Sequence, residues 1–136
     1  MTPAKPEWDD TGPGRVSIRV PGEGRYIELL RSTVGRAARL SGFTFDGIED
    51  LALAVDEAAV LLLDAEPLML DLRLGEVGAG TGRMLVFVSM HDPAREWVRD
   101  DQLGSDMRWQ VLDALCEDVW LMDGRQPGIG LSQTVR

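Results

Sequence analysis

The spacing of apolar and polar positions changes along the chain, and each spacing predicts one kind of element. Apolar residues alternate with polar ones over residues 15–20, which predicts a half-buried strand ended by a Pro-Gly pair. They then recur three and four positions apart over residues 26–40, and again over residues 46–64. This spacing predicts two amphipathic helices, separated by a Ser-Gly pair and closed by the proline at position 67.

The second half of the chain predicts two pairs of strands and one more helix. Its expected elements are strands over 68–74 and 84–90, a long polar loop over 91–105, a helix over 105–117, and strands over 119–122 and 129–135. The order β-α-α-β-β-α-β-β predicts an α+β fold. We expect a two-layer sandwich, with a mainly antiparallel sheet and three helices on one face.

Two local signals refine these elements. Asp46 is the expected N-cap of the second helix, with Glu49 three residues later completing a capping-box pattern. The glycine-rich stretch GEVGAGTGR joins the first two strands of the second half as a hairpin loop. It has no Gly-Lys-Ser/Thr ending and no helix after it, so we interpret it as a flexible turn and not as a phosphate cradle.

Length and composition bound the class of protein. The chain has 136 residues, enough for one domain, and the prolines and glycines of residues 1–14 predict a disordered tail before a single domain over 15–136. A net charge of -9 disfavours direct binding to nucleic acid and favours a protein partner or small ligand. The single cysteine, the lack of a signal-like start and the lack of a long apolar run predict a cytoplasmic protein that does not enter membranes.

The most informative stretch is LALAVDEAAVLLLDAE, residues 51–66, an apolar helix that carries the carboxylate pair Asp56 and Glu57. A glutamate beside an apolar stripe is most simply a half-exposed side chain that reaches solvent. His91 and Asp92 stand without a second histidine or a cysteine neighbour, so we expect no metal site there. Cys116 is expected to be a small core residue.

The aromatic residues divide into two groups. Trp109 and Trp120 fall in predicted elements and are expected in the core or at an interface. Trp97 falls in the polar loop and is a candidate anchor for a partner protein.

The strand-helix-helix opening, the LALAVDEA segment, the hairpin and the late VLDALCEDVWLM segment together resemble the RsbW-type anti-sigma factors. These are small serine-protein kinases with the GHKL, or Bergerat, ATPase fold. The resemblance covers about residues 15–135. It implies a glutamate on the second helix that activates the attacking hydroxyl, and an asparagine four residues later that holds Mg²⁺.

At the positions that the resemblance assigns to nucleotide binding, this chain differs from the family. Glu57 matches the glutamate, but Leu61 stands where the asparagine is expected, and leucine has no oxygen for a hard cation. The family's Asp-x-Gly-x-Gly turn is replaced by SMHDPAREW, in which no glycine follows Asp92. Asp106 and Arg108 occupy the places of a later Gly-x-Gly, with Gly104 nearby. We therefore interpret Glu57 as a vestigial general base, and expect no bound cofactor.

The resemblance also implies partners. We expect an anti-sigma factor that sequesters an alternative RNA polymerase sigma factor, is released by an anti-anti-sigma protein of the STAS fold, and forms a homodimer. In the family the first helix contributes the binding surface, which here implies Arg31, with Glu28 and Ile27 beside it, and Trp97 as a further candidate. Because Arg31 lies opposite the apolar stripe of its helix, its guanidinium is expected to be free for a partner carboxylate.

Three alternatives remain open from the sequence. In the first, Arg31 is a solvated helix residue that contacts no partner protein. In the second the protein is a working kinase, with ATP and Mg²⁺ as cofactors and Glu57 as the base. In the third it is a binding module of the same fold whose partner is not a sigma factor.

Overall fold

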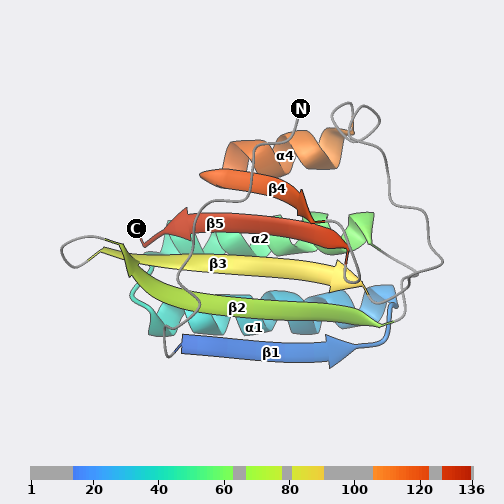
Figure 1. The fold of residues 1–136 in the computed structure, drawn as a ribbon, viewed down its shortest axis with the longest axis horizontal. Coiled ribbons are helices and arrows are strands. Elements are labelled where there is room, and N and C mark those ends of the chain that lie inside the picture. The colour runs from blue at the N-terminus through green and yellow to red at the C-terminus, as the bar shows by residue number, and fades with distance from the viewer. Residues whose placement is uncertain (1–13, 63–66, 78–80, 91–105, 123–126, 136) are drawn as a thin grey trace.

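Two layers make up the fold, a five-stranded antiparallel sheet and a layer of helices (Figure 1). The computed structural model describes residues 14–62, 67–77, 81–90, 106–122 and 127–135. The strand order is β1-β2-β3-β5-β4. The strands are β1 (Gly14–Val20), β2 (Leu68–Val77), β3 (Thr81–Met90), β4 (Asp118–Met122) and β5 (Gly128–Thr134).

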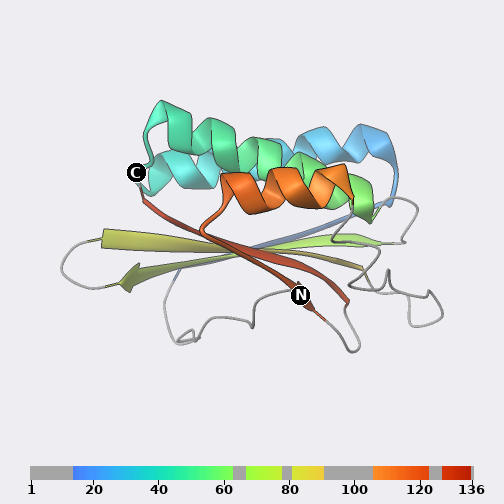
Figure 2. The same cartoon turned by 90° about the horizontal axis from the view of Figure 1, so that it is seen from above.

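The described helices all cover the same face of the sheet, as Figure 2 shows. They are the short 3-10 helix η1 (Gly24–Tyr26) and the α-helices α1 (Ile27–Leu40), α2 (Phe45–Leu61) and α4 (Met107–Leu115). Helix α2 packs against both α1 and α4. The predicted α+β two-layer sandwich is therefore confirmed.

The alternation in β1 turns its apolar residues towards the helix layer, where Val20 is buried and Ile18 is partly buried, whereas Val16 is 39% exposed. Val16, Ile18 and Val20 are directly opposite Leu72, Leu70 and Leu68 of β2. Facing residues of paired strands share one side of the sheet, so these six side chains line the face that the helices cover. All three of these β2 leucines are at most 1% exposed.

The helix stripes predicted from the sequence are the buried ones. In α1 the buried positions are Leu30, Val34, Ala37 and Ala38, and in α2 they include Leu51, Ala54, Val55, Ala58 and Ala59. The alanines of α2 let this helix approach its neighbours closely, and they leave Leu51 as the large side chain that fills the space between the layers.

The N-cap prediction for α2 was wrong. Thr44, not Asp46, caps the helix: its backbone is extended and its side chain accepts a hydrogen bond from the backbone N–H of Gly47 at 3.3 Å. The helix begins at Phe45, so Asp46 lies within its first turn, where a carboxylate interacts favourably with the helix dipole. Thr44 and Asp46 lie two positions apart and are both of the residue types that cap helices, so the sequence pattern did not decide which of them is the N-cap.

The loop predicted for the glycine-rich stretch between β2 and β3 was also longer than the loop in the structure. Pairing between β2 and β3 continues from Leu68 opposite Met90 to Val77 opposite Thr81, through positions assigned to the loop. Glycine has low strand propensity, but backbone pairing in a long hairpin overrides that preference. The candidates Trp97, His91, Asp92 and Gly104, and the predicted tail, lie outside the described residues apart from Gly14, the first residue of β1.

Candidate functional site

The carboxylate pair of α2 lies between two arginines, one from each neighbouring helix. Arg31 of α1 places Nη1 3.0 Å from Oδ2 of Asp56. Arg108 of α4 places Nε 3.5 Å from Oε2 of Glu57. Consecutive residues of an α-helix point about 100° apart, so Asp56 and Glu57 can reach opposite neighbours. The pair thus links the middle helix electrostatically to both of its flanking helices.

The expectation that Arg31 has a free guanidinium was wrong. The helix periodicity correctly turned Arg31 away from the apolar stripe, but α2 packs beside α1 and brings Asp56, 25 positions later, within hydrogen-bond distance. The Arg31 side chain is 46% exposed and that of Asp56 is 23% exposed. A partner could reach this guanidinium only in competition with, or in addition to, Asp56.

Asp56 depends on this contact. Its second carboxylate oxygen, Oδ1, is buried without a hydrogen-bond partner among the described residues. A buried oxygen without a partner loses the solvation that it had in water. Arg31 is therefore the group that balances the charge of a largely covered carboxylate.

Glu57 has a structural partner as well. Its side chain is 26% exposed and faces Arg108, which occupies a position where the resemblance expects glycine. Asp106, at the other such position, is the N-cap of α4 and accepts a hydrogen bond from the backbone N–H of Arg108 at 2.8 Å. Both residues that replace glycines thus have defined roles in starting and anchoring α4.

Leu61, the position expected to be a magnesium-binding asparagine, is the last residue of α2. It is partly buried and packs against the main apolar core. It offers no oxygen to a cation, and its side chain belongs to the packing between the layers. Among the residues that the structure describes, no group of three or more His, Cys, Asp or Glu side chains could hold a metal ion.

The other predicted residues divide between core and surface. Trp109 and Cys116 are buried in the main core, and Trp120 is buried in a smaller cluster with Leu85 and Phe87. On α1, Glu28 is exposed, whereas Ile27 is partly buried and packs against the core. Leu29 beside them is half exposed, so the start of α1 presents a mixed apolar and acidic surface.

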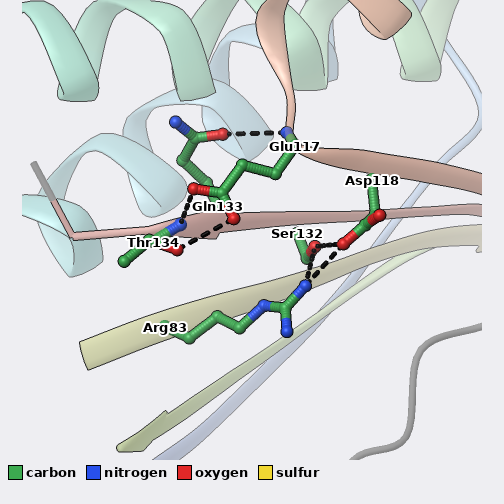
Figure 3. A network of polar contacts seen from close by, with 6 residues as sticks. All are labelled: Arg83, Glu117, Asp118, Ser132, Gln133 and Thr134. Carbon is green, nitrogen blue, oxygen red and sulfur yellow. Dashed lines mark hydrogen bonds and ion pairs between the residues drawn. The ribbon is translucent and has the colours of Figure 1, made fainter. Parts of the chain in front are cut away.

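A polar network that the sequence analysis missed ties the start of β4 to β5 and β3 (Figure 3). The Ser132 hydroxyl donates to Asp118 at 3.0 Å, and Arg83 donates both to Ser132 and to Asp118. Ser132 is fully buried, so its hydroxyl is not accessible from the surface, and its contacts with Asp118 and Arg83 join three strands of the sheet.

The same network extends to Glu117, the residue before the first residue of β4. The Glu117 carboxylate accepts hydrogen bonds from the backbone N–H and hydroxyl of Thr134, and its backbone N–H donates to Gln133 (Figure 3). A run of polar residues in the last predicted strand was the available sequence signal, but nothing in the sequence gave the partners, because Arg83 is 49 residues from Ser132.

Comparisons of the sequence with known proteins find RsbW proteins as relatives. The anti-sigma-F factor RsbW of Mycobacterium tuberculosis is 31% identical over 127 residues, covering 89% of this chain and 73% of that protein. The serine-protein kinases RsbW of Bacillus velezensis and Bacillus cereus match over shorter stretches, 40% identical over 43 residues and 32% over 44. These stretches cover 27% and 28% of the two Bacillus proteins. No family model matches the chain.

None of the helices that the structure describes is both long enough and apolar enough to span a bilayer.

Proposed function

Because the chain belongs to the RsbW family of anti-sigma factors and serine-protein kinases, we propose that it acts as an anti-sigma factor. It binds an alternative RNA polymerase sigma factor in the cytoplasm and keeps it from the polymerase. An anti-anti-sigma protein of the STAS fold competes for it and releases the sigma factor. Sequestration needs a stable complementary surface and no chemistry, so it does not require a working nucleotide site.

We further propose that the nucleotide site is degenerate. The observation that carries this proposal is Leu61, which lies four residues after Glu57, is partly buried and packs against the core. Without an oxygen at that position a magnesium ion loses a protein ligand beside the phosphates. Two further contacts support the same conclusion. Asp106 and Arg108 stand where nucleotide binding in the family needs glycines, and Asp106 caps α4 with its carboxylate. Arg108 also forms an ion pair with Glu57, whereas catalysis in the family needs this glutamate as a free base.

One observation favours a second function, that of an active serine kinase. Glu57 is retained at the position of the family's general base, on a well-formed helix. In that case Glu57 would take the proton of the serine hydroxyl, and another oxygen group would replace the missing magnesium ligand.

Calorimetry with Mg·ATP separates these two functions. We expect no binding in the micromolar range, because both the metal ligand and the glycine turns are replaced. A dissociation constant in the low micromolar range that depends on magnesium would restore the kinase. Phosphorylation of a STAS partner that disappears in Glu57→Gln would do the same.

The partner itself is tested by gel filtration with each candidate sigma factor, with and without ATP. We expect one sigma factor to co-elute in both conditions, with a mass that also reports whether the protein is a homodimer. If no sigma factor co-elutes while another protein is captured, the chain is a binding module of the same fold with a different partner.

The proposed partner surface lies on α1 and includes Arg31, Glu28 and Ile27, with Trp97 as a further candidate. We expect Arg31→Ala to weaken the sigma complex by about 1 to 3 kcal/mol, the range for loss of a charge-assisted hydrogen bond. Arg36→Ala, at another exposed arginine of α1, is the matched control for general charge attraction. Asp56→Ala is the second control, because it frees the guanidinium without removing it and should leave or raise the affinity.

A further inference from the structure

A second, smaller apolar cluster lies on the face of the sheet that none of the described helices covers (Figure 2). It consists of Leu85 and Phe87 of β3 and Trp120 of β4. Successive side chains of a strand point to opposite faces, and the neighbouring residues Val86 and Val119 belong to the core under the helices. The cluster therefore points away from the helix layer.

These three side chains are nevertheless buried. Leu85 is 0% exposed, Phe87 6% and Trp120 1%. A sheet face without a covering layer normally exposes side chains of this size to solvent. The described helices do not supply the cover, because they all lie on the other face (Figure 2).

Trp120 shows where the cover is needed. Its ring lies against the backbone of Gly130 on β5, because a Cβ added to that glycine would be 2.2 to 2.5 Å from three ring atoms. Phe87 meets the same ring edge to face, with ring centroids 5.9 Å apart. These two contacts leave uncovered the side of the ring that points away from the sheet, although the residue is only 1% exposed. The Trp120 Nε1 also has no hydrogen-bond partner among the described residues, so a covering segment with a backbone acceptor would satisfy it.

The residues before β1 enter the sheet beside this cluster. Thirteen residues precede Gly14 in the sequence. Gly14 lies opposite Leu74 of β2, which in turn lies opposite Met84, the residue before Leu85. Pro13 has no backbone N–H, which favours an end to regular strand pairing at this point.

Trp8 is within reach of the Trp120 ring. It precedes Gly14 by six positions, and six extended residues span about 20 Å. The ring lies over Gly130, whose row in the sheet runs through Phe87 and Asp71 to Ser17. From Gly14 that point is three strands across and three residues along, which amounts to about 18 Å.

Charge also suits this segment to this face. Trp8 stands in the sequence Glu-Trp-Asp-Asp, residues 7–10. Arg15 and Arg19 of β1 alternate with the residues under the helices, so they lie on the same face as the cluster. Arg19 is exposed and has no ion pair with the part of the chain that the structure describes. Residues 91–105, by contrast, connect the end of β3 to α4, which lies in the helix layer.

We propose that residues 1–13 lie across this face of the sheet and that Trp8 packs on the Trp120 ring, closing a second core with Leu85 and Phe87. The segment is then an ordered part of the domain, and not the tail that its prolines and glycines predict. The α1 surface proposed for the sigma factor lies in the other layer, so this inference does not depend on that assignment.

Fluorine NMR of the full chain labelled with fluorotryptophan tests the contact, since each of the four tryptophans gives its own signal. Trp8→Ala should move the Trp120 signal by more than its linewidth, because it removes a ring that packs on Trp120. Trp97→Ala is the matched control and should leave that signal in place. The Trp8 signal should respond little to exchange of water for heavy water, as expected of a buried ring.

Urea unfolding gives a second measurement. Trp8→Ala should lower the folding equilibrium constant about tenfold, since it removes a large apolar cover from the cluster. Trp8→Phe keeps an aromatic ring at this position and should recover most of that loss.

Three results would overturn the proposal. The first is a Trp120 signal that stays in place in Trp8→Ala. The second is a Trp8 signal that responds to heavy water as strongly as free fluorotryptophan does, which would place this ring in solvent. The third is a Trp120 signal that moves in Trp97→Ala and not in Trp8→Ala, which would identify residues 91–105 as the cover.

Discussion

The contact between Arg31 and Asp56 gives the sharpest prediction about stability. Were it an ordinary surface ion pair, Arg31→Ala would cost about 0.2 to 1 kcal/mol, since arginine and alanine both favour helices. Asp56 is only 23% exposed, however, and its Oδ1 already lacks a partner among the described residues. Removing Arg31 leaves a largely covered carboxylate with no partner for Oδ2 as well. We therefore expect a loss of about 2 kcal/mol in the free energy of unfolding.

A double-mutant cycle measures this coupling directly. Asp56→Ala removes the carboxylate along with its solvation cost, so it should cost less, about 1 kcal/mol, and Arg31→Ala should then add little in the double variant. The expected coupling energy is about 1.5 to 2 kcal/mol. Urea unfolding followed by circular dichroism gives each value, with an unchanged slope confirming that the unfolded state is comparable.

A coupling energy below about 0.3 kcal/mol would refute this reasoning, because it would mean that the two side chains do not depend on one another. Measuring the cycle at low and high salt adds a check. A partly covered pair should retain more than half of its coupling at high salt, whereas a fully exposed pair would lose most of it.

Three further predictions concern single positions. Glu57→Ala should lower the free energy of unfolding, measured by urea unfolding, by at most about 1 kcal/mol. It should leave the affinity for the sigma factor, measured by calorimetry, unchanged within about 0.5 kcal/mol, and the loss of a kinase activity that the unsubstituted protein has would contradict this prediction. Thr44→Ala should cost about 1 kcal/mol and Asp46→Ala about half as much or less, so the reverse order in urea unfolding would restore the aspartate as the cap. Gly130→Ala should cost about 3 kcal/mol, because its new Cβ would lie 2.2 Å from the Trp120 ring, whereas Gly24→Ala, with nothing within 4 Å, should be nearly neutral in thermal unfolding.

Local patterns were sufficient for the elements and for the side of each element that is buried. The alternation of β1 and the three- and four-residue spacing of α1 and α2 depend on periods of 2 and 3.6, which a single sequence displays directly. The alternation of helices and hairpins was enough to predict the two layers. Where two neighbouring residues could serve one local role, as Thr44 and Asp46 could at the start of α2, the pattern did not decide between them.

Contacts between distant residues could not be obtained in this way. Nothing near Arg31 in the sequence indicates Asp56, and nothing near Glu57 indicates Arg108, since each pair forms only when α2 packs between α1 and α4. The network around Ser132 likewise requires strands that pair across the sheet. The sequence by itself determined which side chains face the core, because burial follows the period of each element. Only the tertiary structure decided which charges meet, because that depends on how the elements lie beside one another.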